Sequence, residues 1–252
     1  MKRWPYPRLL AHRGGGNLAP ENTLVGMRVA HQHGFVAVEF DVKLSADGVA
    51  MLMHDDALAR TTNGSGLFRD LTATQLATLD AGAWKDPRFA GEPIPRFDAV
   101  MHYLASNRML ANVEIKPCAG REAETGRAVA LLCESLAAAH LPKPLLSSFS
   151  VAALRAAAIA APALPRALLV ERYSAADDDV IAELGCVALN CAWDTVERGM
   201  LAHLHARCVH VMAYTVNETS LAERLFALGV DGIFTDALDV MAARFPSALG
   251  AQ

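Results

Sequence analysis

Two carboxylates that lie one residue apart are the first side chains of this sequence to suggest chemistry. Glu39 and Asp41 belong to a strand-like run, residues 36–42, whose other members are apolar. Side chains alternate between the two faces of a strand, so both carboxylates point to the same side. Like charges on one face of an apolar strand repel, and a divalent cation is the simplest group that offsets them. For the pair taken alone, a strand with one solvent-exposed face is an equally good interpretation.

The same spacing returns further along the chain. In the strand-like run 112–116, Glu114 and Lys116 share one face, while Val113 and Ile115 occupy the other. The sequence therefore offers three carboxylates in two strands, and a lysine beside the third. Carboxylate oxygens are the ligands that hard cations such as Mg²⁺ and Ca²⁺ prefer.

Two histidines stand where other strand-like segments end. His12 is followed directly by Arg13, and His54 is followed by Asp55. The ordinary pKa of histidine suits both general acid and general base catalysis near neutral pH. An arginine can hold two phosphate oxygens at once, and a cation beside it can neutralise charge on a phosphoryl group in the transition state. Any one of these residues is unremarkable, but their joint position at strand ends predicts a site for phosphodiester cleavage.

An alternation of strands and helices must position these residues. Strand-like segments, most of them followed by a helical pattern, are centred on Leu10, Val38, Ile115, Leu146, Leu169, Leu189, Val211 and Ile233. Eight such repeats predict an α/β fold, a single TIM (β/α)8 barrel over residues 1–252, in preference to an open doubly wound sheet. The alternation breaks over residues 55–94, where we expect a small insertion after the second strand. Because barrel strands end at one mouth, the candidate residues should converge there.

Composition argues against several classes of function. The chain is 53% hydrophobic and 20% charged with a formal net charge of -4, which is typical of a soluble enzyme and lacks the basic footprint of a nucleic-acid-binding protein. No apolar stretch is long enough for stable membrane insertion. The start does not resemble a signal peptide, and the five cysteines lack zinc-like spacing, so we expect reduced thiols and a cytoplasmic protein.

The ordered set of motifs resembles the glycerophosphodiester phosphodiesterase family, most closely its bacterial cytoplasmic members linked to glycerol 3-phosphate uptake. The motifs are His12-Arg13-Gly14, Pro20-Glu21-Asn22-Thr23, Glu39-Phe40-Asp41-Val42, Asp47-Gly48, His54-Asp55, Glu114-Ile115-Lys116-Pro117, Tyr214-Thr215-Val216-Asn217 and the run 229–236. They cover nearly the whole chain in the right order. The resemblance implies a TIM barrel with a small insertion, and hydrolysis of small-molecule glycerophosphodiesters to sn-glycerol 3-phosphate and an alcohol, within glycerol and lipid metabolism.

The resemblance also implies which residues bind metal and which move protons. Glu39, Asp41 and Glu114 match the ligands of one divalent cation, for which Mg²⁺ and Ca²⁺ are equally suitable. His12 and His54 match the acid–base pair. We predict that His12 deprotonates the glycerol 2-hydroxyl for internal attack on phosphorus, and that His54 protonates the departing alcohol. A cyclic glycerol phosphate would result, because internal attack has a large proximity advantage.

The remaining site residues concern the phosphate and the pocket. Arg13 and Lys116 match the phosphate-contacting cations. Tyr214 stands where many relatives have tryptophan, so its hydroxyl either contacts the glycerol or the leaving group or belongs to an aromatic that only lines the barrel. We expect Glu21 and Asn22 to order the loop around His12.

Two other functions compete with this interpretation. A lysophospholipase D-type enzyme would use the same machinery on lipids, but the apolar residues of the insertion, Leu67, Phe68, Trp84 and Phe89, form no amphipathic membrane stripe. A catalytically silent barrel that binds phosphodiesters would be expected to have lost a ligand or a histidine, and none is missing. The alcohol released and the oligomeric state are left open.

Overall fold

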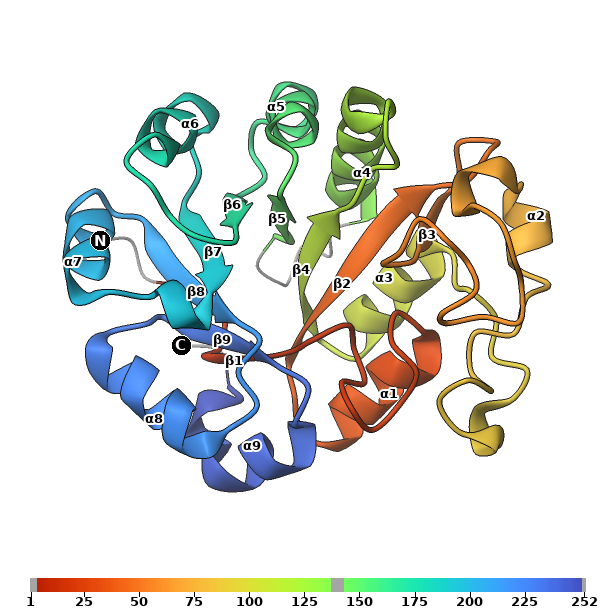
Figure 1. Cartoon of the computed structure of the whole chain (residues 1–252), viewed down its shortest axis with the longest axis horizontal. Helices are drawn as coiled ribbons and strands as arrows, with labels where there is room; N and C mark the ends of the chain where they lie inside the picture. Colours follow the sequence, from red (N-terminus) through yellow and green to blue (C-terminus); the bar gives the residue numbers. More distant parts are fainter. Residues whose placement is uncertain (1–3, 137–142, 251–252) are drawn as a thin grey trace.

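The computed structural model describes residues 4–136 and 143–250, in which a ring of parallel strands lies inside a ring of helices (Figure 1). The parallel strands of these residues are β1 (Leu9–Ala11), β2 (Ala37–Leu44), β4 (Leu110–Ile115), β5 (Leu145–Ser148), β6 (Arg166–Val170), β7 (Ala188–Ala192), β8 (His210–Tyr214) and β9 (Gly232–Thr235). Each pairs with its neighbours, and β1 pairs with both β9 and β2, so the ring closes. The predicted TIM barrel is confirmed. A further strand, β3 (Ala50–Leu52), pairs antiparallel with β2.

The helices cover the outside of the barrel (Figure 1). They are α1 (Leu24–Gln32), α3 (Phe97–Ser106), α4 (Glu122–Leu136), α5 (Val151–Ala160), α6 (Asp177–Leu184), α7 (Arg198–Ala206), α8 (Thr219–Leu228) and α9 (Leu238–Arg244). The Thr23 hydroxyl begins α1 by accepting a hydrogen bond from the Gly26 amide at 3.1 Å. Gly185 and Gly229 end α6 and α8 in the left-handed conformation that glycine adopts without a Cβ penalty. Two short 3-10 helices, η3 (Trp193–Thr195) and η4 (Pro246–Ala248), follow β7 and α9.

The alternation of side chains along β2 separates the two sides of the barrel wall. Val38, Phe40 and Val42 are fully buried in the apolar layer between strands and helices. Glu39 and Asp41 therefore point into the barrel, as the sequence pattern predicts.

The barrel interior is apolar at one end and polar at the other. Leu10, Leu110 and Phe234 pack with Trp4 and Tyr6, which precede the first strand. This cluster fills the end of the barrel at which the strands begin. Polar groups that lie above it must therefore bind each other or a ligand that enters from the opposite end.

A segment with little regular structure connects β3 to α3. It contains only short helical pieces, η1 (Phe68–Asp70), α2 (Ala73–Leu76) and η2 (Pro87–Phe89). Leu58 and Phe68 anchor it through a small apolar cluster of its own, which also includes Met51 of β3. The segment is thus a folded unit beside the barrel mouth.

In the described part of the chain, no helix has the length and apolar character needed to cross a membrane.

Candidate active site

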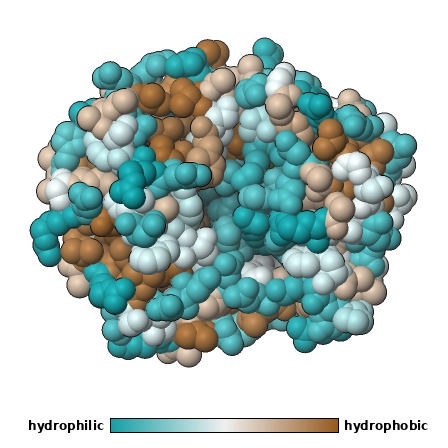
Figure 2. Space-filling view, viewed as in Figure 1, coloured by the Kyte–Doolittle hydropathy of each residue, from teal (hydrophilic) through white to brown (hydrophobic). Residues whose placement is uncertain are grey.

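A pocket of about 260 Å³ opens at the carboxyl ends of the barrel strands. Figure 2 shows it as a hollow at the centre of one face, with mostly hydrophilic residues around it. Its lining includes all but one of the residues proposed from sequence: His12, Arg13, Glu39, His54, Glu114, Lys116 and Tyr214. The exception is Asp41, which is 1% exposed but has a carboxylate oxygen within 4.8 Å of one from each of Glu39 and Glu114. The barrel therefore brings the sequence-predicted residues to one place.

Three buried carboxylates form the centre of the pocket. The register between β2 and β4 places Asp41 beside Glu114, and one oxygen from each of Glu39, Asp41 and Glu114 lies within 4.8 Å of the others. Burial and the negative charge of Asp41 raise the pKa of Glu39 to about 7 and that of Glu114 to about 8. A cluster of oxygen donors with more negative charge than the protein comfortably holds fits a hard divalent cation.

Asp41 is the carboxylate that the protein itself stabilises. Asn22 holds it at two points: the side-chain amide donates to Oδ2 at 2.8 Å, and the side-chain carbonyl accepts from the Asp41 amide at 3.0 Å. Lys116 Nζ lies 3.4 Å from Oδ1, and Arg13 Nε lies 3.7 Å from Oδ2. Burial favours the neutral acid, but these two cations, together with His54 and the hydrogen bond from Asn22, outweigh it and lower the pKa of Asp41. Asp41 thus stays ionised, whereas the pKa values of Glu39 and Glu114 lie close to neutral pH.

His12 is held by Asp236, which Asn217 fixes in turn. Its Nδ1 donates to Asp236 Oδ1 at 2.7 Å, just after β9, and Asn217, just after β8, binds Asp236 through both its amide and its carbonyl. Burial opposes a charge on His12, but the bond to Asp236 and the nearby Glu39 outweigh it and raise its pKa. The loop after β1 can approach Asp236 this closely because Gly16 has no Cβ, which at this position would collide with the Asp236 backbone.

His54 has a different kind of support. Its Nδ1 donates to Asp55 Oδ1 at 2.6 Å, and Asp55 also accepts two hydrogen bonds from Arg60 of the segment that follows β3. The other side of the Arg60 guanidinium donates to both oxygens of Glu21, at 2.8 and 2.7 Å. Glu21 in turn accepts a hydrogen bond from Arg13 Nη1 at 2.9 Å. Burial lowers the pKa of His54. The charge of Arg13 lowers it further, and the charge of Asp41 acts in the opposite direction without reversing the shift.

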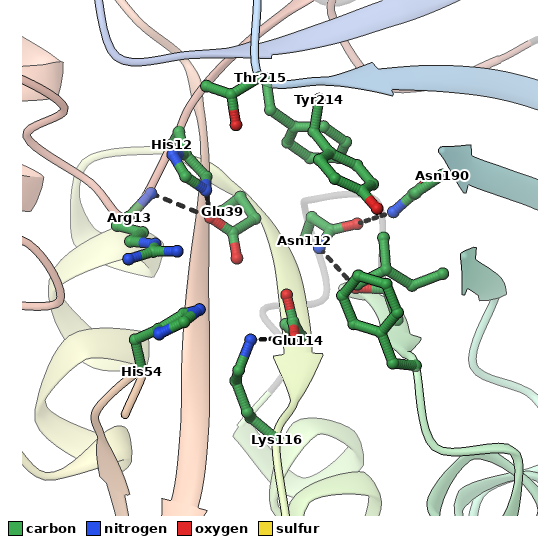
Figure 3. A pocket seen from close by; sticks show the side chains of 14 residues that line it. His12, Arg13, Glu39, His54, Asn112, Glu114, Lys116, Asn190, Tyr214 and Thr215 are labelled. Atoms are coloured by element: carbon green, nitrogen blue, oxygen red, sulfur yellow. Dashed lines mark hydrogen bonds and ion pairs between the residues drawn. The ribbon is translucent and has the colours of Figure 1, made fainter. Parts of the chain in front are cut away.

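The two phosphate-binding candidates are fixed by acidic partners. Lys116 Nζ donates to Glu114 Oε1 at 2.9 Å, and the Arg13 backbone amide donates to Glu39 Oε2 at 2.9 Å. The Arg13 Nε is buried without a hydrogen-bond partner. Figure 3 shows both side chains reaching toward the space between His12 and His54. A phosphate in that space would meet positive charge from both sides.

Tyr214 lies on the wall of the pocket that is opposite Arg13 (Figure 3). Its hydroxyl donates to the Val170 carbonyl at 2.7 Å, and its ring meets Phe149 edge-on at 6.1 Å between centroids. The hydroxyl is therefore bound to the backbone of the barrel, and the ring of Tyr214 lines the pocket. Phe149 also lies under Lys116, whose Nζ is 5.7 Å from the ring centroid.

Several residues at the site were not assigned a role from sequence, among them Asp236, Arg60, Asn112 and Asn190. Asp236 lies in the closing motif of the family resemblance, and Asn112 lies two residues before Glu114, which is the same-face spacing already used for the carboxylates. That spacing could have found Asn112. Arg60 and Asn190 lie in no pattern that marks them, and only the folded chain shows their contacts.

Fold and site define a class before any comparison is made: a TIM-barrel enzyme whose carboxylates, cations and histidines suit the chemistry of phosphate esters. Comparison with known proteins places the chain within that class. The model of the glycerophosphoryl diester phosphodiesterase family matches residues 12–240. The chain is 30% identical over 228 residues to the glycerophosphodiester phosphodiesterase of Caldanaerobacter subterraneus, and the match covers 90% of this chain and 93% of that protein.

Two solved structures of phosphodiesterases also resemble this chain. A phosphodiesterase of Oleispira antarctica, in complex with the product sn-glycerol-3-phosphate, matches with a TM-score of 0.92 and 34% identity over 96% of this chain and 97% of that one. The glycerophosphodiester phosphodiesterase of Agrobacterium tumefaciens matches with a TM-score of 0.80 and 28% identity over 94% and 99% of the two chains. The chain belongs to the glycerophosphoryl diester phosphodiesterase family, and it is an enzyme of that phosphodiesterase class.

Proposed function

We propose that this protein hydrolyses glycerophosphodiesters to sn-glycerol 3-phosphate and an alcohol, with the help of one divalent cation. The observation that carries the proposal is the convergence, in one pocket, of three buried carboxylates between two histidines that each bind an aspartate. The relative from Oleispira antarctica, which holds sn-glycerol-3-phosphate, supports the same substrate class.

Glu39, Asp41 and Glu114 would hold the cation, with Mg²⁺ and Ca²⁺ both suited to these ligands. When bound, the cation would polarise the phosphoryl oxygens and offset the charge of the site. The chain's own cations, Arg13 and Lys116, would bind the remaining phosphate charge, because both already face the space between the histidines.

The histidines would move the protons. Each offers its Nε2 to the pocket because its Nδ1 is bound to an aspartate, at 2.7 Å for His12 and 2.6 Å for His54. One removes the proton of the glycerol 2-hydroxyl as that oxygen attacks phosphorus, and the other protonates the alcohol that leaves. A cyclic glycerol phosphate forms, and water opens it with the roles reversed.

The order that we predict from the sequence has His12 as the base and His54 as the acid. In the metal-free protein, Asp236 and Glu39 hold the pKa of His12 up against burial. Neutralisation of Glu39 would lower that pKa and favour the basic form of His12. Substrates whose alcohol leaves without a proton distinguish the acid from the base.

The context of the enzyme follows from the same residues. We propose that residues 1–252 act as one catalytic domain, with residues 55–94 as an insertion that supplies Arg60 to the site. All five cysteines are free, and four of them are buried. This supports a cytoplasmic enzyme of glycerol and lipid metabolism.

The direct test is a turnover assay on glycerophosphocholine with coupled detection of glycerol 3-phosphate. We expect turnover with Mg²⁺ or Ca²⁺ and its loss with a chelator. A matched substrate whose glycerol lacks the 2-hydroxyl should be inert if attack is internal, and an equal rate on that substrate would refute the cyclic intermediate. Lysophosphatidylcholine serves as the comparison lipid, and faster turnover of it would identify a lysophospholipase D-type enzyme. Binding of glycerophosphocholine without turnover would identify a silent barrel.

A further inference from the structure

The floor of the pocket carries a short chain of polar side chains that the proposed reaction does not use. Asn112 Nδ2 donates to Ser147 Oγ at 2.8 Å, and Asn190 Nδ2 lies 3.4 Å from Asn112 Oδ1. These residues come from β4, β5 and β7, and each is at most 1% exposed. All three line the same pocket as Glu39 and Glu114, and Figure 3 shows Asn112 and Asn190 joined by a dashed contact.

The chain ends on a polar atom that has no partner in the protein. Asn190 Oδ1 is buried and makes no hydrogen bond. The apolar neighbours of Asn190 give it nothing to bind, since its partners in register are Leu169 on β6 and Met212 on β8. A buried acceptor without a donor is rare in folded proteins because its desolvation is not repaid. A group that enters the pocket should therefore supply the donor.

The shape of the pocket indicates which part of a glycerophosphodiester can reach this atom. Asn112, Ser147 and Asn190 on the floor are at most 1% exposed, whereas Phe149, which also lines the pocket, is 45% exposed to solvent. The leaving alcohol varies between substrates, so it needs the open side. The glycerol is constant and small, and its 2-hydroxyl must lie near the phosphorus between the histidines. Its terminal hydroxyl is then the group that can extend down to the floor.

The chemistry of the asparagine chain also favours a hydroxyl. If Asn112 and Asn190 both turned their amides over, Ser147 could donate where it now accepts, and Asn190 would present its nitrogen to the pocket. A hydroxyl both donates and accepts, so it pairs with either edge of the amide. A carboxylate or an ammonium group would pair with only one.

We propose that Asn190, oriented by Asn112, is a specificity-determining residue that binds the terminal hydroxyl of the substrate's glycerol. The proposal rests on the proposed function, because it assumes that a glycerophosphodiester occupies the pocket. It adds that the enzyme selects a glycerol with a free terminal hydroxyl, and that diesters with a methyl group or an acyl chain at that position are poor substrates.

The test compares two substrates in two proteins. Glycerophosphocholine is compared with the analogue whose terminal CH₂OH is a methyl group, which keeps the 2-hydroxyl and the choline. For the natural protein, we expect kcat/KM to fall by roughly 10- to 100-fold with the methyl analogue, the range for a buried polar group left unpaired. In Asn190→Leu, which has a similar size and no polar atom, kcat/KM for the two substrates should become equal to within about threefold.

A matched control keeps the result interpretable. Leu169→Ala alters the pocket wall next to Asn190 without removing a hydrogen-bonding group, and it should preserve the natural protein's ratio between the two substrates. Thermal melting checks that each variant is folded. Equal kcat/KM for the two substrates in the natural protein needs no variant and would overturn the inference. So would a folded Asn190→Leu protein that still discriminates between them. Absence of turnover on both substrates would instead contradict the proposed function.

Discussion

The two histidines stand on the same barrel mouth, but the protein supports them in different ways. The partner of His12, Asp236, is bound by Asn217, a neutral side chain at the end of the next strand. The partner of His54, Asp55, is bound by the charged guanidinium of Arg60, which comes from outside the barrel. Asp236 therefore directs its charge mainly to His12, with Arg13 acting on it only at longer range, whereas Asp55 divides its charge between His54 and a cation that it binds directly.

This difference matches the directions of the two pKa values. The bond to Asp236 helps to raise the pKa of His12 against burial, while burial prevails at His54 and lowers its pKa. Two histidines whose surroundings move their pKa values apart can hold a proton and lack one at the same pH. The barrel thus supplies one half of the acid–base pair, and the segment after β3 supplies the other.

The largest effect is expected from removal of either histidine. His12→Ala and His54→Ala should each lower kcat on glycerophosphocholine by about 10²- to 10⁴-fold. The variant that lacks the general acid should recover much of its rate on a glycerol phosphodiester of p-nitrophenol, because that alcohol leaves without a proton. The variant that lacks the base should not recover. Recovery in His54→Ala would support the order predicted from sequence, recovery in His12→Ala would reverse it, and near-normal rates in either variant would contradict the pairing.

The next effect concerns the two aspartates. Asp236→Asn should lower kcat by about 100-fold, because His12 would lose both its orientation and the charge that raises its pKa. Asp55→Asn should cost less, about tenfold, because Arg60 already offsets the charge of Asp55. The measurement is kcat against pH for both variants. We expect the limb that depends on His12 to move to lower pH in Asp236→Asn, and equal losses with unmoved limbs would show that the two halves are equivalent.

A smaller effect is expected at Arg60. Arg60→Met would remove the cation that binds Asp55, so Asp55 would act on His54 alone and the pKa of His54 should rise. We expect kcat to fall about threefold to tenfold, with the limb that depends on His54 displaced to higher pH.

A control from the same segment separates this role from general loss of charge. Arg69 is equally exposed, at 43%, and its side chain donates to the Ala119 carbonyl. Arg69→Met should leave the pH profile unchanged. If both variants lose activity alike, Arg60 does not position His54, and its effect would be one of the segment's stability.

The smallest effect concerns stability and the carboxylates between the two halves. Glu39 and Glu114, with pKa values of about 7 and about 8, hold more protons in the folded protein than in the unfolded chain above pH 4.5. The free energy of unfolding of the metal-free protein should therefore fall as the pH rises from about 5 to 8. The gain in Tm on adding Mg²⁺ or Ca²⁺ should grow over the same range. Glu39→Gln should flatten the metal-free dependence, and a Tm gain independent of pH would contradict these shifted pKa values.

Much of the fold could be predicted because local patterns mark it. The alternation of apolar residues along β2 placed Glu39 and Asp41 inside the barrel, and the eight repeats indicated a closed ring. The site residues at strand ends followed from that ring. The support of the histidines could not be predicted in the same way. Asp236 lies in the closing motif, but nothing local shows that it binds His12, and no pattern marks Arg60 as the residue that binds Asp55.

By itself, the sequence determined which side chains could bind a cation and phosphate and which face of each strand they occupy, because a strand's alternation depends only on position along the chain. The tertiary structure decided which of them meet. His12 and Asp236 are 224 positions apart and touch only because β1 closes the ring against β9. Asn112 and Asn190 are 78 positions apart and meet across the barrel interior. Such contacts depend on ring closure and on the size of the side chains that fill the barrel, which the whole fold sets at once.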